Sequence, residues 1–204
     1  MRVMKSLALL ATLAAVSFAA PYQVVVDTTS LAGGDFQVYM ALTSNLPGNT
    51  VTASGFTFGG GAAIQPPLFG TGNLTSTVTL QTPQPGNFLF DQFAQNFTAG
   101  SSLIFLLDFS NTPPASGNPP DTFAFAISDT GGANLATTDP KGDNNLLVVD
   151  LTGGPLSFNT YTTLVGDVTV RVSQVNDVPE PAFGAAVGGL LALVAGVRRF
   201  RKSA

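Results

Sequence analysis

The sequence predicts an all-β fold, an antiparallel β-sandwich of the jelly-roll or immunoglobulin-like kind, flanked by an N-terminal signal peptide and a C-terminal transmembrane helix. Short runs rich in Val, Phe, Leu and Thr recur between residues 22 and 175, and turn formers such as Gly33-Gly34 and Gly131-Gly132 separate them. No stretch of this region shows the apolar period of an amphipathic helix. Many short strands with turns at this spacing are typical of two packed antiparallel sheets.

Nine runs are predicted as strands: Tyr22–Asp27, Phe36–Leu42, Val51–Phe58, Leu74–Leu80, Phe88–Phe97, Leu103–Phe109, Thr122–Ser128, Leu146–Leu151 and Val165–Val175. The last run alternates most clearly, and we expect Val168, Val170 and Val172 to point inward and the polar residues between them outward. Residues 123–127 have no polar side chain on either face, so we expect that strand to lie centrally in its sheet.

The first 19 residues predict a secretory signal peptide. Arg2 and Lys5 precede a short apolar run, and small residues follow it. We expect export through the Sec translocon and cleavage by signal peptidase after Ala19, because a cut one residue later would place Phe18 at the −3 position. An N-terminal anchor is the alternative, although the run is too short to span a bilayer comfortably.

The last 27 residues, 178–204, have three parts in a fixed order. The motif Pro179-Glu180-Pro181 comes first, and the 16 residues of the uncharged run 182–197 follow. A helix of that length is about 24 Å long, so it spans the roughly 30 Å hydrocarbon core only with bilayer thinning or extension. The tail over 198–204 is basic, and we expect its cations to stay in the cytoplasm: Arg198, Arg199, Arg201 and Lys202.

Residues 178–204 resemble the PEP-CTERM sorting domain of exported bacterial proteins, in motif, apolar span and Arg-rich end. The resemblance implies recognition by an exosortase, a membrane transpeptidase-like enzyme that acts near the Pro-Glu-Pro motif. It also implies a place in the cell envelope or extracellular matrix, often beside an exopolysaccharide or biofilm programme. From the residues alone an ordinary C-terminal membrane anchor explains the tail equally well. A looser likeness to small PEP-CTERM proteins of unknown activity rests on residues 26–33, 120–125 and 138–142, and implies only a β-rich exported domain.

The exterior domain, predicted over residues 20–177, is acidic and has a narrow side-chain chemistry. All twelve acidic residues lie between residues 20 and 181, where Lys141 and Arg171 are the two basic residues, so the net charge there is −10. Such a surface repels nucleic acid, and we expect none as a partner. The chain has no Cys and no His, which excludes disulfides, thiolate nucleophiles, Ser-His-Asp triads and His metal sites.

We therefore expect no catalysis. Glu180 is the one glutamate and belongs to the sorting motif, so a paired-carboxylate hydrolase would need two aspartates. Most aspartates follow strands or lie in turns, where they usually bind backbone amides. The Phe residues, Phe88, Phe90, Phe93 and Phe97 included, are expected to fill the core, and the absence of Trp counts against a dedicated carbohydrate module.

One loop, residues 139–145, is a candidate calcium site. Asp139 and Asp143 could offer carboxylate oxygens, which Ca²⁺ binds at about 2.3–2.6 Å. The loop is not an EF-hand, because the bidentate Glu is missing and Lys141 lies among the ligands. Ordinary turn chemistry explains the same residues, so both interpretations stay open.

The sequence as a whole predicts an exported, non-enzymatic structural protein of the cell envelope or extracellular matrix, sorted by an exosortase. Its C-terminal span would anchor it in the membrane, transiently before processing or stably. The alternative is a non-catalytic module that binds polysaccharide or calcium in the same matrix. A hydrolase comes third, and it would require two Asp carboxyls about 5–9 Å apart in a cleft.

Overall fold

A computed structural model describes residues 20–44, 48–82, 89–110, 121–151 and 155–175. The predicted signal peptide with its cleavage site at Ala19, the Pro-rich segment 112–120 and the sorting signal 178–204 lie outside the described residues. The described strands belong to one compact unit that ends at Gln174. Among the described residues no helix is long and apolar enough to cross a membrane.

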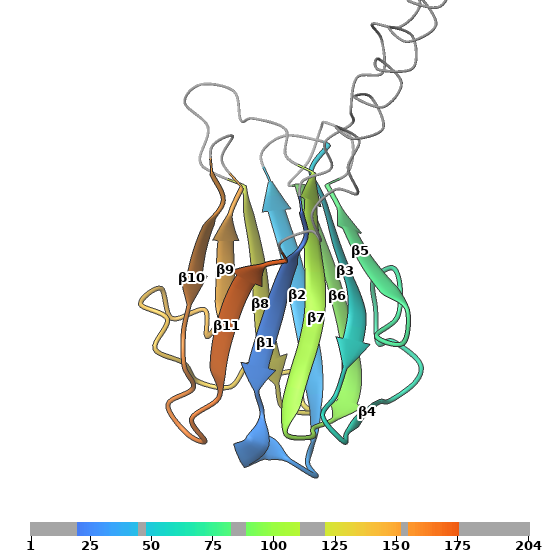
Figure 1. Cartoon of the computed structure of the whole chain (residues 1–204), viewed down its shortest axis with the longest axis vertical. Coiled ribbons are helices and arrows are strands. Elements are labelled where there is room, and N and C mark those ends of the chain that lie inside the picture. Colours follow the sequence, from blue (N-terminus) through green and yellow to red (C-terminus); the bar gives the residue numbers. More distant parts are fainter. Residues whose placement is uncertain (1–19, 45–47, 83–88, 111–120, 152–154, 176–204) are drawn as a thin grey trace, which may run out of the picture. The chain divides into compact units, whose positions relative to one another are not determined.

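In the described part of the chain eleven strands form two antiparallel sheets, and the five-stranded sheet lies in front of the six-stranded one in Figure 1. The five-stranded sheet has the order β11 (Thr169–Gln174), β1 (Tyr22–Asp27), β7 (Ser102–Ser110), β3 (Thr50–Thr57) and β5 (Thr77–Gln81). The six-stranded sheet has the order β10 (Ser157–Thr160), β9 (Leu147–Asp150), β8 (Thr122–Ser128), β2 (Asp35–Ser44), β6 (Leu89–Thr98) and β4 (Ala62–Ala63). A single 3₁₀ turn, η1 (Thr29–Leu31), follows β1 in the described residues.

The prediction of an all-β fold with antiparallel strands is confirmed, and each predicted run overlaps an observed strand. Residues 123–127 lie in β8 between β9 and β2, as expected of a strand that is apolar on both faces. The strand predicted from residue 165 begins only at Thr169, because Gly166 and Asp167 have positive φ angles of 89° and 49° and form a turn. Two observed strands, β4 and β10, were not predicted. β4 is only two residues long, and β10 has only one apolar residue, so neither shows the alternating pattern of a strand.

The order of the strands places distant parts of the chain side by side. β1 pairs with β7, β2 with β6, and β3 with β5, so the chain from β1 to β7 folds back on itself in nested pairs around β4. Most consecutive strands alternate between the two sheets, whereas β8, β9 and β10 follow one another in one sheet. As a result β1 lies between β7 and the last strand, β11.

The inner faces of the two sheets share one hydrophobic core. Aromatic rings of the two sheets meet there: the ring centroids of Phe105 in β7 and Phe125 in β8 are 5.2 Å apart. The expectation that Phe fills the core is confirmed for Phe93 and Phe97. It is wrong for Phe90, which is 43% exposed, because period-two alternation places it on the outer face when Phe93 points inward.

Candidate functional site

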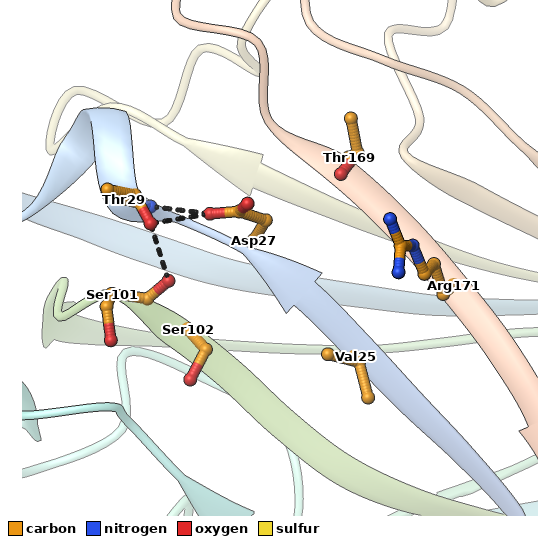
Figure 2. Close-up of a pocket in the computed structure, with 7 residues that line it drawn as sticks. All are labelled: Val25, Asp27, Thr29, Ser101, Ser102, Thr169 and Arg171. Carbon is orange, nitrogen blue, oxygen red and sulfur yellow. Dashed lines mark hydrogen bonds between the residues drawn. The ribbon is translucent and has the colours of Figure 1, made fainter.

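A surface pocket of about 360 Å³ lies at the end of β1 on the outer face of the five-stranded sheet (Figure 2). Alternation along β1 explains which side chains reach it, because Val24 and Val26 are fully buried in the core, and Val25 and Asp27, which alternate with them, face outward. Cross-strand register brings the other walls: Asp27 pairs with Ser102 of β7 and with Thr169 of β11. The residues that line the pocket are Val25, Asp27, Thr29, Ser101, Ser102, Thr169 and Arg171.

Asp27 ends β1 and organises the turn that follows it. Its Oδ1 accepts hydrogen bonds from the Thr29 hydroxyl at 2.7 Å and from the Thr29 backbone amide at 3.0 Å, as Figure 2 shows. These two bonds hold the pKa of Asp27 below its ordinary value of 3.8, and the charge of Arg171 adds a smaller lowering. The pocket therefore contains an ionised carboxylate at neutral pH, and its Oδ2 accepts no hydrogen bond in the described part of the chain.

The turn after β1 is fixed to the connection between β6 and β7. The buried hydroxyl of Thr28 donates to the Gly100 carbonyl at 2.8 Å, and the Thr28 amide donates to the Ser101 carbonyl at 3.2 Å. A Cβ on Gly100 would lie 2.1 Å from the carbonyl oxygen of Phe58, so this connection packs against neighbouring backbone without room for a side chain. These contacts therefore fix the positions of Ser101 and Ser102 relative to the end of β1.

Among the described residues Arg171 is the one cation that lines the pocket, and it lies opposite Val25 on the edge strand β11. Its side chain is exposed, and in the described part of the chain its guanidinium donates no hydrogen bond and forms no ion pair. The hydroxyls of Ser102 and Thr169 are likewise without a hydrogen bond in the described part. The pocket thus offers a cation, a carboxylate oxygen and two hydroxyls for binding, and one carboxyl in it is too few for paired-carboxylate hydrolysis.

The predicted calcium loop is built differently. Asp139 is only 6% exposed, and its Oδ1 accepts the Lys141 amide at 3.0 Å. Its Oδ2 accepts the backbone amide and the side-chain amide of Asn145 at 3.3 and 3.2 Å. Asp143 is exposed, and its carbonyl accepts the side-chain amide of Asn134 at 3.1 Å. Among the described residues no group of three or more acidic, His or Cys side chains could hold a metal ion, and the calcium site at Asp139 and Asp143 stays a prediction.

A second polar cluster is buried inside the domain and was not predicted. The side-chain amide of Asn49 donates to the carboxylate of Asp121, and both residues are fully buried. The Asn49 backbone amide donates to the Thr82 hydroxyl at 3.1 Å, and the Leu151 amide donates to the Asp121 carbonyl at 2.8 Å. These bonds join the ends of strands from both sheets, which indicates a structural role.

Sequence reasoning placed the site at the 139–145 loop and did not identify the pocket at Asp27. One signal was available, because Arg171 is one of two cations in residues 20–177 and was predicted to point outward. The pairing of β11 with β1 was not available from the sequence. The predicted sorting residues lie outside the described residues: Pro179, Glu180, Pro181, Arg198, Arg199, Arg201 and Lys202.

The interpretation of this pocket depends on its own geometry. Its side chains can bind a ligand through charge and hydrogen bonds, and their arrangement comes from three strands that are distant in the sequence. Comparison with protein-family models, with curated proteins and with solved structures finds no match.

Proposed function

We propose that the protein is an exported structural component of the cell envelope or extracellular matrix, sorted by an exosortase through residues 178–204. The observation that supports this proposal is the order of Pro179-Glu180-Pro181, an uncharged run and four cations at the C-terminal end of the sequence. The signal peptide predicted over residues 1–19 supports delivery by the Sec translocon. The acidic composition of residues 20–177 supports a soluble exterior domain and argues against nucleic acid as a partner.

The exterior domain is proposed to be a β-sandwich of the jelly-roll kind. Two features favour this over the immunoglobulin-like kind: the nested pairing of β1 with β7, β2 with β6 and β3 with β5, and the alternation of consecutive strands between sheets. In immunoglobulin-like sandwiches more of the consecutive strands form hairpins within one sheet. A compact domain of this kind needs neither a metal nor a disulfide to bury its core.

Binding of polysaccharide in the same matrix is the second candidate function. The pocket beside Asp27 and Arg171 favours it, because its exposed hydrogen-bonding groups are typical of a site for a hydroxylated ligand. The calcium alternative has less support, since both oxygens of Asp139 already accept hydrogen bonds. A hydrolase remains the third and least supported candidate.

Intact mass spectrometry of the protein from a host with an exosortase tests the sorting proposal. We expect the mature chain to begin at Ala20 and to end before Ala182, with or without an added group. The variant Glu180→Ala should retain the tail, whereas the matched variant Asp177→Ala, three residues upstream, should be processed normally. Native protein that ends mainly at Ala204 would contradict the proposal and favour a stable membrane anchor.

A further inference from the structure

We propose that the pocket between β1, β7 and β11 binds an acidic sugar residue, that is, a hydroxylated ring with a carboxylate. The proposal deepens the second candidate function and rests on it. It names the chemical class of the ligand from the groups that line the pocket: Asp27, Ser102, Thr169 and Arg171.

Arg171 indicates the carboxylate. A guanidinium presents a planar fork of donors that matches a carboxylate with two parallel hydrogen bonds. In the described part of the chain the Arg171 guanidinium has no hydrogen-bond partner, although acidic residues far outnumber basic ones in this domain. An acidic domain disfavours anions over most of its surface, so this pocket is where an anionic group gains a specific partner.

Asp27 limits the charge of that ligand. Its carboxylate stays ionised, because Thr29 donates two hydrogen bonds to Oδ1. A negative charge beside Arg171 repels a dianion such as phosphate more strongly than a single carboxylate. The Oδ2 atom accepts no hydrogen bond in the described part of the chain, so it can accept one from a ligand hydroxyl.

The rest of the lining fits a sugar ring. The Ser102 and Thr169 hydroxyls each can donate and accept a hydrogen bond, and a sugar hydroxyl does the same. Val25, which lies opposite Arg171, offers an apolar contact for the C–H groups of the ring. The volume of about 360 Å³ is at the small end of small-molecule sites, which suits one sugar residue of a chain rather than a whole oligosaccharide.

No aromatic side chain from the described segments lines the pocket, so none of them contributes stacking to binding. We therefore expect millimolar affinity for a single acidic sugar, and stronger retention of a polymer that engages several copies of the protein at once. Weak binding to each repeat is compatible with a matrix protein, because a polymer presents many repeats.

Binding of trigalacturonate to the full-length chain tests the proposal, measured by calorimetry in a detergent without a sugar headgroup. Maltotriose, a neutral trisaccharide, serves as the control ligand. We expect trigalacturonate to bind saturably and maltotriose to bind at least about tenfold more weakly, since a charge-assisted bond is lost. Arg171→Gln should weaken trigalacturonate binding about tenfold or more. The affinity of Arg171→Lys should lie between those of the wild type and Arg171→Gln, because lysine keeps the charge and loses the planar pair of donors.

Lys141→Gln is the matched control, because it makes the same charge change at the other cation of the domain and should alter affinity less than about twofold. Ser102→Ala tests the hydroxyl lining independently of charge, and it should weaken the binding of trigalacturonate. Equal losses in Arg171→Gln and Lys141→Gln would overturn the proposal, since only net charge would then matter. Equal binding of both ligands to the wild type would leave a neutral-sugar module and overturn the acidic specificity. If neither trigalacturonate nor maltotriose binds saturably up to roughly 10 mM, both the acidic specificity and the second candidate function are overturned. The sorting proposal would stay intact.

Discussion

Two turns of this protein use the same local chemistry and differ in what surrounds them. In each, an Asp carboxylate accepts a hydrogen bond from the backbone amide two residues later, at 3.0 Å: Asp27 from Thr29 and Asp139 from Lys141. Asp139 is buried, and its second oxygen accepts two more bonds from Asn145. Asp27 is exposed and lines a pocket, and its second oxygen accepts no hydrogen bond in the described part of the chain.

The difference shows how a turn becomes a site. In the described part of the chain every hydrogen-bond donor to the Asp139 carboxylate lies within six residues of it. Both of its oxygens therefore accept hydrogen bonds from its own loop. The pocket walls beside Asp27 come instead from β7 and β11, and the Thr28 hydroxyl is bonded to a residue 72 positions away. A short acidic motif therefore predicts a turn in both places, and only the strands packed around it decide whether a ligand can reach it.

The largest difference between the two turns should appear in stability. Asp139→Ala leaves the two buried Asn145 donors and the part-buried Lys141 amide without a partner, and we expect the free energy of unfolding to fall by about 2–3 kcal/mol. Asp27→Ala should cost less, because water can replace the lost bonds at an exposed carboxylate. Urea unfolding of the two variants, followed by circular dichroism, measures both changes. If Asp27→Ala lowers the free energy of unfolding as much as Asp139→Ala does, the bonds of the exposed carboxylate stabilise the fold as much as those of the buried one, which contradicts this prediction.

A smaller effect should appear in the titration of Asp27. Its pKa is lowered in the folded state, so its ionisation stabilises the fold above the unfolded pKa, and this contribution is lost as the pH falls through the folded pKa. Thr29→Val should raise the Asp27 pKa more than Arg171→Gln, because the hydroxyl bond is the largest cause of the shift. Carbon-detected NMR of the carboxyl measures both. A larger rise of the Asp27 pKa in Arg171→Gln than in Thr29→Val would mean that the charge of Arg171 is the main cause of the shift. The Asp27 and Arg171 side chains would then lie closer together than the structure shows.

The smallest effect should be that of calcium on the Asp139 loop. Millimolar Ca²⁺ should raise the melting temperature no more than Na⁺ at matched ionic strength, because both oxygens of Asp139 already accept hydrogen bonds. A true site would add about 2.7 kcal/mol at a hundredfold excess over the dissociation constant. A gain specific to Ca²⁺ that Asp143→Asn abolishes would restore the calcium interpretation and make this loop a second site.

Several features could be predicted from the sequence because they depend on neighbouring residues. Alternation predicted that Val168 and Val170 are buried and that Arg171 is exposed, and all three are so placed. The start of β11 was predicted four residues too early, because the apolar residues Leu164 and Val165 belong to an exposed turn. The strand β10 was missed because its residues, Ser157–Thr160, lack the pattern, and its backbone is held by pairing with β9.

The sequence by itself determined the β-rich class, the outward direction of Arg171 and the turn chemistry of Asp27 and Asp139, since each depends on side-chain alternation or on hydrogen bonds within a few residues. Only the tertiary structure decided that β1 lies between β7 and β11 and that Arg171 and Ser102 therefore line one pocket with Asp27. The physical reason is that strand pairing depends on backbone hydrogen bonds and on burial of a shared core. Many alternative strand orders would satisfy the same backbone hydrogen bonds and bury similar apolar residues, so only the packing of the whole chain selects one of them.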